Sequence, residues 1–431
     1  MNRLADQLPH RDAVKLLEAG PARLARLQTR RKLWLQAHLW LGLVLGLFLS
    51  VIGLTGSVLV FYDAIDKALN ADLMTVRALP AGEAAFRPLA DCLAAANAAM
   101  PGQAKLEAIL YPADAGSAYA FDYQAPTAVG MADGWQVLVD PYHAQVLGKR
   151  LNHKAGDWLP PGFVAFVFFL HDALLVGGVG GTLVGVMAVL LLFSVLTGLI
   201  VWWPLTGKWR RALVIKRRAS AERLNHDLHQ TFGFYAAPVL LAVLLSGIYM
   251  NLPGQFMALV KLFSPATRSF EDLPHSMPLP GAKPLSLEQA LDIARSRYPE
   301  GRLNWLRPAL VPKATHQISF RDVPGLSRFW SERQIFIDPY SGAILAVRGP
   351  ATRQTLGEGF MDWQWPLHSG KAFGWPGRIL VFLTGLACPG LFVTGLIRWL
   401  QKRKARRLRG SHGRRAEDSA SGRRKPASQT S

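Results

Sequence analysis

The chain has 431 residues, of which 50% are hydrophobic, and its formal net charge at pH 7 is +20. The hydrophobic residues lie in long runs with the charges between them, whereas a soluble domain spreads them at the period of its helices or strands. The basic residues flank these runs, which is typical of a chain that crosses a membrane and is surrounded by membrane lipid. The positive charge is therefore explained by membrane topology, and no nucleic-acid partner is expected.

Four apolar runs are long enough to cross a membrane, since about 20 helical residues span a hydrocarbon layer about 30 Å thick. Each must satisfy its own backbone hydrogen bonds in lipid, which predicts a helix. The predicted transmembrane helices cover residues 33–62, 161–204, 225–252 and 367–400. The first run is too long for a signal peptide, and no small-residue cleavage site follows it.

Clusters of Lys and Arg lie before the first run, between the second and third, and after the fourth. Such clusters accumulate on the cytoplasmic side, so both termini and the middle loop are expected in the cytoplasm. The remaining segments are then a cytoplasmic N-terminal segment (1–32), an outer module (63–160), a cytoplasmic loop (205–224), a second outer module (253–366) and a disordered cytoplasmic tail (401–431).

The transmembrane runs repeat in pairs. The first and third share His38 with Gly42 and Thr55-Gly56, and His229 with Gly233 and Ser246-Gly247, all separated by 191 residues. The second and fourth share His171 and His368, followed by Thr-Gly-Leu-Ile and a tryptophan, all separated by 197 residues. Constant separations of this kind predict an internal duplication.

The outer segments repeat as well. Residues 137–147 match residues 335–345, and each stretch reads as a strand, a turn opened by Asp-Pro, and a second strand. Helices are predicted upstream over residues 87–99 and 286–298, the second opened by a Ser286/Gln289 capping box. Further strands are predicted near residues 105–111, 117–123, 302–306 and 316–321.

The predicted fold class is therefore an α-helical membrane protein with four transmembrane helices and two α+β extracytoplasmic modules, internally duplicated. Each module is expected to be a helix packed on a small antiparallel sheet. The two cysteines, Cys92 in the first module and Cys388 in the last run, are not expected to pair. A P-loop, a nucleophile elbow, a His-Glu-x-x-His zinc motif and a dinucleotide fingerprint do not occur, so no catalytic residue is assigned.

The Asp-Pro-Tyr hairpin after a short helix resembles the PepSY module. Residues 30–400 resemble the PepSY-associated transmembrane family, which includes bacterial iron-regulated membrane proteins and ferric-siderophore reductases. The first module departs from the pattern, with His143-Ala144 where the second has Ser341-Gly342. The resemblance implies PepSY-like periplasmic modules, a place in the bacterial inner membrane, and an iron siderophore or other ferric chelate as substrate.

Four of the repeated residues are histidines in or beside the runs, where a polar ring needs a partner. His38 and His229 begin the first and third runs, and His171 and His368 begin the second and fourth from the other side. The repeat would make the members of each pair face one another, an arrangement that suits the axial ligands of a haem iron. We therefore predict two b-type haems, with these four histidines as cofactor-binding and metal-ligating residues, although a single haem stays open.

Other interpretations of these residues stay open. Histidines are tolerated at a membrane interface, and a duplication preserves structural residues as well as functional ones. His226 and His229, at i and i+3, can also form a metal site, but the repeat places Leu35 opposite His226. The scattered histidines are expected on the surface: His143, His153, His275 and His316.

The expected function is transmembrane electron transfer by an oxidoreductase of the ferric-chelate reductase type. A quinol or a cytoplasmic reductase would supply electrons, and reduction would release Fe(II), which hard-oxygen chelators bind less tightly than Fe(III). The alternative is a non-enzymatic PepSY-type regulatory or partner-binding membrane protein. A transporter is disfavoured because the runs hold few charged residues.

Overall fold

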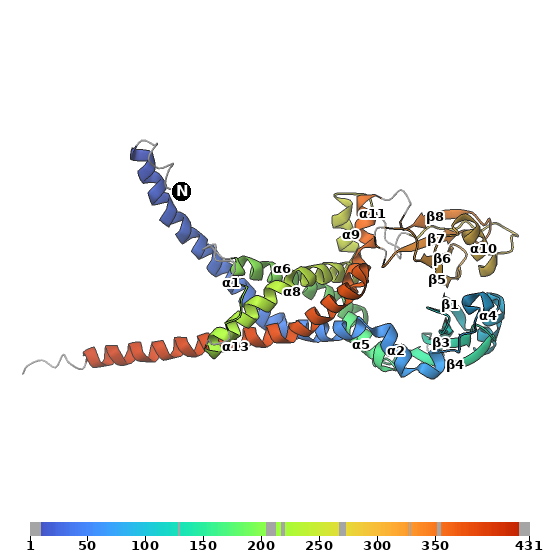
Figure 1. The fold of residues 1–431 in the computed structure, drawn as a ribbon, viewed down its shortest axis with the longest axis horizontal. Coiled ribbons are helices and arrows are strands. Elements are labelled where there is room, and N and C mark those ends of the chain that lie inside the picture. Colours follow the sequence, from blue (N-terminus) through green and yellow to red (C-terminus); the bar gives the residue numbers. More distant parts are fainter. Residues whose placement is uncertain are drawn as a thin grey trace, which may run out of the picture. The chain divides into compact units, whose positions relative to one another are not determined.

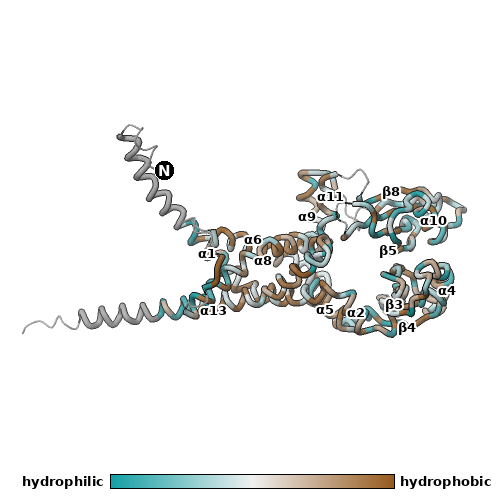
Figure 2. Tube along the Cα trace, viewed as in Figure 1, coloured by the Kyte–Doolittle hydropathy of each residue, from teal (hydrophilic) through white to brown (hydrophobic). Residues whose placement is uncertain are grey.

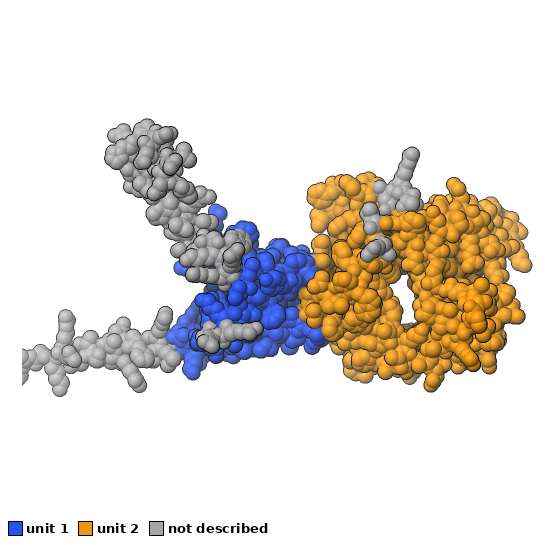
Figure 3. All heavy atoms as spheres, viewed as in Figure 1, with its two compact units in different colours: residues 1–54, 189–241, 386–431 blue, residues 55–188, 242–385 orange. Residues whose placement is uncertain are grey.

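The computed structural model describes residues 10–127, 130–203, 213–216, 220–266, 273–325, 327, 329–350 and 355–421, with side chains described between residues 29 and 407. The chain divides into two compact units (Figure 3). Unit 1 comprises residues 1–54, 189–241 and 386–431, and unit 2 comprises residues 55–188 and 242–385.

Four helices in the described part of the chain are long and apolar enough to cross a membrane: α1 (His10–Leu59), α6 (Gly177–Trp202), α8 (Ala221–Asn251) and α13 (Gly374–Ser421). Their apolar stretches are Thr29–Leu59, Gly177–Trp202, Ala221–Asn251 and Lys371–Arg407. Figure 1 labels these helices, and Figure 2 shows that hydrophobic residues dominate their apolar stretches. The chain is thus a membrane protein with four apolar helices, as the hydropathy pattern predicts.

Two helix boundaries differ from the predicted segments. Between residues 161 and 204 the chain forms α5 (Phe163–Ala173) and α6 rather than one helix, because Leu174 and Leu175 adopt left-handed conformations with φ of 50° and 61°. α13 continues to Ser421 through the first part of the predicted disordered tail, which is rich in good helix formers. The last ten residues of that tail, the first nine of the N-terminal segment and much of the 205–224 loop lie outside the described residues.

Eight strands in unit 2 form a single antiparallel sheet: β1 (Lys105–Leu110), β2 (Tyr119–Pro126), β3 (Ala132–Asp140), β4 (Gln145–His153), β5 (Arg302–Arg307), β6 (His316–Arg321), β7 (Glu332–Ile337) and β8 (Ile344–Arg348). The strand order is β4-β3-β2-β1-β5-β6-β7-β8. β1 pairs with β5, with Ile109 opposite Leu306. This corrects the expectation of two separate small sheets, because pairing β1 with β5 removes an unpaired edge from each half.

One face of the sheet forms the hydrophobic core with α4 (Leu89–Ala98) and α10 (Leu287–Arg297). Alternate residues of β2, including Phe121 and Tyr123, point into this core and are at most 2% exposed. The Ser286/Gln289 capping box that opens α10 is confirmed, with hydrogen bonds in both directions. The other face of the sheet carries polar residues.

The Asp-Pro turns are closed by the aspartates themselves. Asp140 accepts a hydrogen bond from the Tyr142 N–H at 2.7 Å, and Asp338 accepts two from the following residues of its turn. Ala144 has φ of 52° at the place where the second turn has Gly342 with φ of 71°. The first turn therefore places an alanine in a conformation that favours glycine.

Short helices link the apolar helices to the sheet in unit 2: α2 (Tyr62–Leu69), α3 (Ala71–Met74), η2 (Gly82–Ala85), α9 (Pro253–Lys261), α11 (Leu356–Asp362), α12 (Gln364–His368) and η3 (Lys371–Phe373). Arg150 of β4 holds α2 through a two-bond contact with the Asp66 carboxylate, at 2.8 and 2.7 Å. Cys92 and Cys388 are buried free thiols, as expected.

Candidate functional site

His38 of α1 and His229 of α8 form a histidine pair within unit 1. Their ring centres are 6.2 Å apart and the ring planes are inclined by 67°. Nδ1 of His38 lies 2.9 Å from the carbonyl oxygen of Ser194, and Nδ1 of His229 lies 3.1 Å from that of Leu391. A carbonyl only accepts hydrogen bonds, so both Nδ1 atoms carry the proton and Nε2 is the nitrogen that can bind a metal ion.

His171 of α5 and His368 of α12 form a second pair within unit 2. Their ring centres are 6.0 Å apart and their planes are inclined by 70°. Nδ1 of His368 lies 3.0 Å from the carbonyl oxygen of Val243 and 2.9 Å from the hydroxyl of Ser246. Nδ1 of His171 lies 3.1 Å from the hydroxyl of Thr55. The second pair thus repeats the spacing of the first, with hydroxyls of the repeated motifs beside its rings.

The repeated Thr-Gly and Ser-Gly motifs lie against the four histidines. In each contact the glycine comes from the neighbouring helix: Gly198 with His38, Gly395 with His229, Gly56 with His171 and Gly247 with His368. A Cβ atom at Gly56 or Gly198 would lie only 2.9 Å from an imidazole carbon, closer than real Cβ atoms approach. Glycine is therefore required where an imidazole packs directly on the backbone of the next helix.

The spacing within each pair fits one iron between two imidazoles. An imidazole nitrogen lies about 1.1 Å from its ring centre and binds a metal ion at about 2 Å, so two rings on opposite sides of one ion have centres about 6.2 Å apart. Within the described residues, three or more His, Cys, Asp or Glu side chains do not gather into a metal site. Two imidazoles supply two ligands to an ion, and a planar macrocycle can supply the others, as in an iron porphyrin.

A cavity of about 700 Å³ adjoins the His38/His229 pair within unit 1. This volume lies in the usual range for small-molecule and cofactor sites. Gly42 lines the cavity one turn after His38, and a Cβ atom at this position would meet no other atom within 4 Å. Gly233, one turn after His229, also lines it, with only Leu391 nearby at 3.7 Å. The missing side chains leave room beside both rings.

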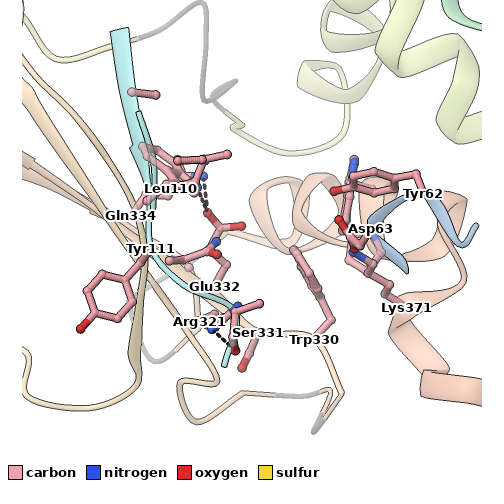
Figure 4. Close-up of a pocket in the computed structure, with 18 of the residues that line it drawn as sticks. Tyr62, Asp63, Leu110, Tyr111, Arg321, Trp330, Ser331, Glu332, Gln334 and Lys371 are labelled. Carbon is pink, nitrogen blue, oxygen red and sulfur yellow. Dashed lines mark hydrogen bonds and ion pairs between the residues drawn. The ribbon is translucent and has the colours of Figure 1, made fainter. Parts of the chain in front are cut away.

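A second cavity, of about 1380 Å³, lies within unit 2 against the polar face of the sheet. The unit is visibly hollowed (Figure 3), and residues of β6 and β7 face Tyr62, Asp63 and Lys371 across the space (Figure 4). The Lys371 ammonium lies 3.2 Å from the Asp63 carboxylate. It also lies 4.9 Å from the ring centre of Trp365, 5.3 Å from that of Trp330 and 5.4 Å from that of Tyr62. Three aromatic faces thus stabilise this cation.

Lys371 connects the second cavity to the His171/His368 pair. It follows His368 by three residues, and Trp365 precedes His368 by three. Trp365 packs on Trp330 with ring centres 4.4 Å apart, so the segment that carries His368 also forms one wall of the cavity. A ligand in this cavity would meet the same structural segment that positions the histidine.

Polar side chains of the strands line one side of the second cavity. Asp122 of β2 lines the cavity between two core residues, and burial raises the pKa of its carboxyl although Gln136 donates a hydrogen bond to it. Arg321 of β6 also lines the cavity, and burial lowers the pKa of its guanidinium. Charged groups held in partly dry surroundings are common at binding sites.

The structure brings together the histidines that the repeat pairs, His38 with His229 and His171 with His368. His226 instead has its Nδ1 3.4 Å from the Asp227 carboxylate. The expectation of a surface position is wrong for His316, which is 5% exposed. Its ring accepts a hydrogen bond from the Ala309 N–H, and its position on β6 has the same parity as the core residues of that strand.

Among the cavity residues of unit 2, the sequence draws attention only to tryptophans such as Trp330 and Trp365, which can stack on a planar ligand but are more commonly found at membrane interfaces. A usable signal was the alternation along the strands, such as Asp122 between Phe121 and Tyr123, which predicts a polar second face. The cluster around Lys371 has no comparable signal, because its members come from segments far apart in the sequence. Trp330 and Tyr62, for instance, are brought together only by the fold.

The fold and the site define a four-helix membrane protein that carries an antiparallel sheet and two histidine pairs. Residues 35–402 match the family model described as the PepSY-associated TM region, so the chain belongs to this family. The matched segment contains all four paired histidines and confirms the resemblance noted in the sequence. No match is found among the curated proteins.

Proposed function

We propose that the protein binds one haem b at each histidine pair and transfers electrons across the membrane to a ferric chelate. The spacing of the two pairs, 6.2 and 6.0 Å between ring centres, is the observation that carries this proposal. When bound, such a haem supplies one-electron transfer through its iron. The protein supplies the ligands, the distance between the sites and the electrostatic surroundings.

The hydrogen bonds to Nδ1 prepare the histidines for this role. A carbonyl acceptor such as that of Leu391 or Val243 fixes the tautomer, holds the ring plane and makes Nε2 a stronger ligand. The hydroxyls of Thr394 and Ser246 add a second contact to His229 and His368. These groups, which lie outside the proposed ligand set, would hold the rings in a ligating orientation.

The basic residues support an orientation in the bacterial inner membrane with both termini in the cytoplasm. In that orientation the His38/His229 pair lies near the cytoplasmic side, where a quinol or a cytoplasmic reductase would donate electrons. The sheet and its cavity then lie in the periplasm.

The duplicated architecture is part of the same proposal. Each half of the chain supplies one histidine to each pair, and each half supplies four strands and one covering helix to the sheet. We infer that the halves arose by duplication and that each α+β half is a PepSY module. Duplication would explain why both pairs use the same hydroxyl-and-glycine surroundings.

The cavity of unit 2 suits a large ferric chelate such as a ferric siderophore. Its volume of about 1380 Å³ exceeds that of most drug-sized sites. Reduction transfers one electron from the donor to the chelated Fe(III), forming Fe(II), and no bond to carbon or oxygen of the chelator needs to break first. Hard-oxygen chelators hold Fe(II) less tightly, so the iron would leave.

Single histidine variants test the haem proposal. His38→Ala and His368→Ala should each remove one haem and leave the other, because each variant destroys one pair and leaves the other pair unchanged. The measurement is the haem-to-protein ratio of purified protein after expression with ample haem. Variants that keep the full haem content would contradict the ligand assignment and favour the non-enzymatic regulatory alternative.

A tryptophan variant tests the substrate cavity. Trp330→Ala removes an aromatic wall, so the dithionite-reduced protein should bind and reduce a ferric siderophore more weakly, with unchanged haem spectra. Trp158→Ala is the matched control, because Trp158 is 72% exposed and does not line the cavity. Equal rates for the two variants would remove the cavity from the proposal.

A further inference from the structure

The mouth of the unit 1 cavity has an unusual charge. Among the described residues that line this cavity, six are basic and none is acidic: Arg31, Arg398, Lys402, Arg403, Arg406 and Arg407. Basic residues beside a membrane span are commonly explained by topology or by lipid headgroups. Here, however, they line the same cavity as His38 and His229.

The basic residues continue the helix faces that hold the histidines. On α13, Gly395 contacts His229, and Arg398 and Lys402 follow at three and seven residues, which places them on the same face. On α1, Arg31 precedes His38 by seven residues and again shares its face. On each of these two helices, one face thus carries both a cation and the residue that is, or contacts, a paired histidine.

This arrangement is unfavourable without an anion. Arg398, Lys402 and Arg406 are spaced four residues apart, and like charges at this spacing repel one another on a helix. The Glu222 carboxylate offsets part of the charge at Arg398, but the like charge of Arg223 acts on Arg398 more strongly. Lys402 lies within reach of the like charges of Arg398 and Arg406. A bound anion would offset the repulsion.

We propose that Arg398 and Lys402 bind the propionate carboxylates of the haem held by His38 and His229. This inference rests on the proposed function. Haem b carries both of its carboxylates on one edge, and the rest of its rim is apolar. The guanidinium fork of Arg398 matches a carboxylate through two hydrogen bonds, while Lys402 contributes a point charge. The carboxylate edge would therefore lie against Arg398 and Lys402, and the apolar rim against the wall that contains Gly42.

The test compares haem with an uncharged analogue. Full-length protein carrying His368→Ala, so that only the His38/His229 site binds, is titrated in neutral detergent with ferric haem b and with its dimethyl ester. Arg398→Gln or Lys402→Gln should weaken binding of haem about tenfold and leave binding of the ester unchanged. Lys404→Gln is the matched control, with the same change of charge on the same helix, because Lys404 does not line the cavity.

The outcomes separate this inference from the proposed function. Equal effects on both porphyrins, or no effect beyond that of Lys404→Gln, would overturn the inference while leaving the haem site intact. Weaker retention of phosphatidylglycerol by the detergent-purified protein, with unchanged haem affinity, would assign the cations to lipid and would also overturn the inference. A parent protein that binds neither porphyrin contradicts the proposed function itself.

A second variant and a second readout are available if one variant does not fold or if the protein cannot be prepared without haem. If Arg398→Gln does not accumulate, Lys402→Gln provides the same test, because Lys402 is exposed at the mouth. Transfer of haem from the loaded proteins to an excess of a haem acceptor gives a second readout. Loss should be about tenfold faster from Lys402→Gln than from Lys404→Gln, and equal rates would contradict the inference.

Discussion

The glycine beside His38 offers a way to block the proposed haem site without touching a ligand. Gly42 lines the cavity one turn after His38, and a Cβ atom there meets no other atom within 4 Å. Leucine adds four carbons, so Gly42→Leu fits the protein alone but occupies space in the cavity of about 700 Å³. Overpacking of about 1–3 kcal/mol corresponds to roughly 5- to 150-fold weaker binding.

The two effects of this substitution have opposite signs. Replacing glycine in a helix should stabilise the protein without haem by roughly 0.5–1 kcal/mol, because glycine is a poor helix former. Haem content should nevertheless fall from two per chain towards one. Gly390→Leu is the control, since Gly390 also lies in a helix with open space around it but does not line the cavity.

The assay is haem content and thermal unfolding of both purified variants. Gly390→Leu should keep two haems, and Gly42→Leu should lose the one at the His38/His229 pair. If Gly42→Leu retains two haems, the cavity is not the haem site and the reasoning from open space is refuted.

Three further predictions concern single contacts. Ser246→Ala removes the hydroxyl beside His368 and should weaken haem retention at the His171/His368 pair up to about tenfold. The measurement is the rate of haem transfer to a haem acceptor, with Ser50→Ala as the control. An unchanged rate would show that the hydroxyl contact does not contribute to haem binding. Ala144→Gly should raise the free energy of unfolding by about 0.5–1 kcal/mol because residue 144 has positive φ, whereas Gly342→Ala should lower it; the opposite signs in denaturant titrations would contradict the turn geometry. Burial alone would raise the pKa of the Asp338 carboxyl, but hydrogen bonds within its turn lower it below the usual value of about 4. The stabilising effect of the Asp338 carboxylate is therefore present above about pH 4 and lost as pH falls through the lowered pKa. Asp338→Asn should make the free energy of unfolding depend less on pH in this acid range. An unchanged pH dependence would contradict the assignment of the effect to Asp338.

The sequence predicts the membrane helices and the hairpins well, because both depend on local patterns. An apolar run such as Thr29–Leu59 is visible without any tertiary information. The Asp-Pro turns are also local, since Asp338 bonds to the backbone two and three residues later. The repeat adds long-range information, because a constant separation pairs His38 with His229 before any contact is known.

The features that were not predicted depend on contacts between distant segments. The pairing of β1 with β5 joins residues almost 200 positions apart, and neither strand has a sequence mark of its partner. The break at Leu174 and Leu175 lies in leucines, which normally continue a helix, so its position has no local mark in the sequence. Beside it, the Asn251 amide donates a hydrogen bond to the Asp172 carbonyl.

The partners of the histidines form an intermediate case. The repeated Thr-Gly and Ser-Gly motifs were visible in the sequence, but their role was not. The structure shows Gly198 against His38 and Gly56 against His171, so each motif serves a ring on the neighbouring helix. A repeated small-residue motif beside a repeated histidine can therefore be taken as a predicted packing partner in related chains.

The most direct test of the account is the haem-to-protein ratio of the purified full-length protein, measured together with its reduced-minus-oxidised absorbance spectrum. Two histidine pairs at ligating spacing predict two haems per chain and the spectrum of low-spin iron with two imidazole ligands. Protein expressed with ample haem that shows no Soret band would contradict the account.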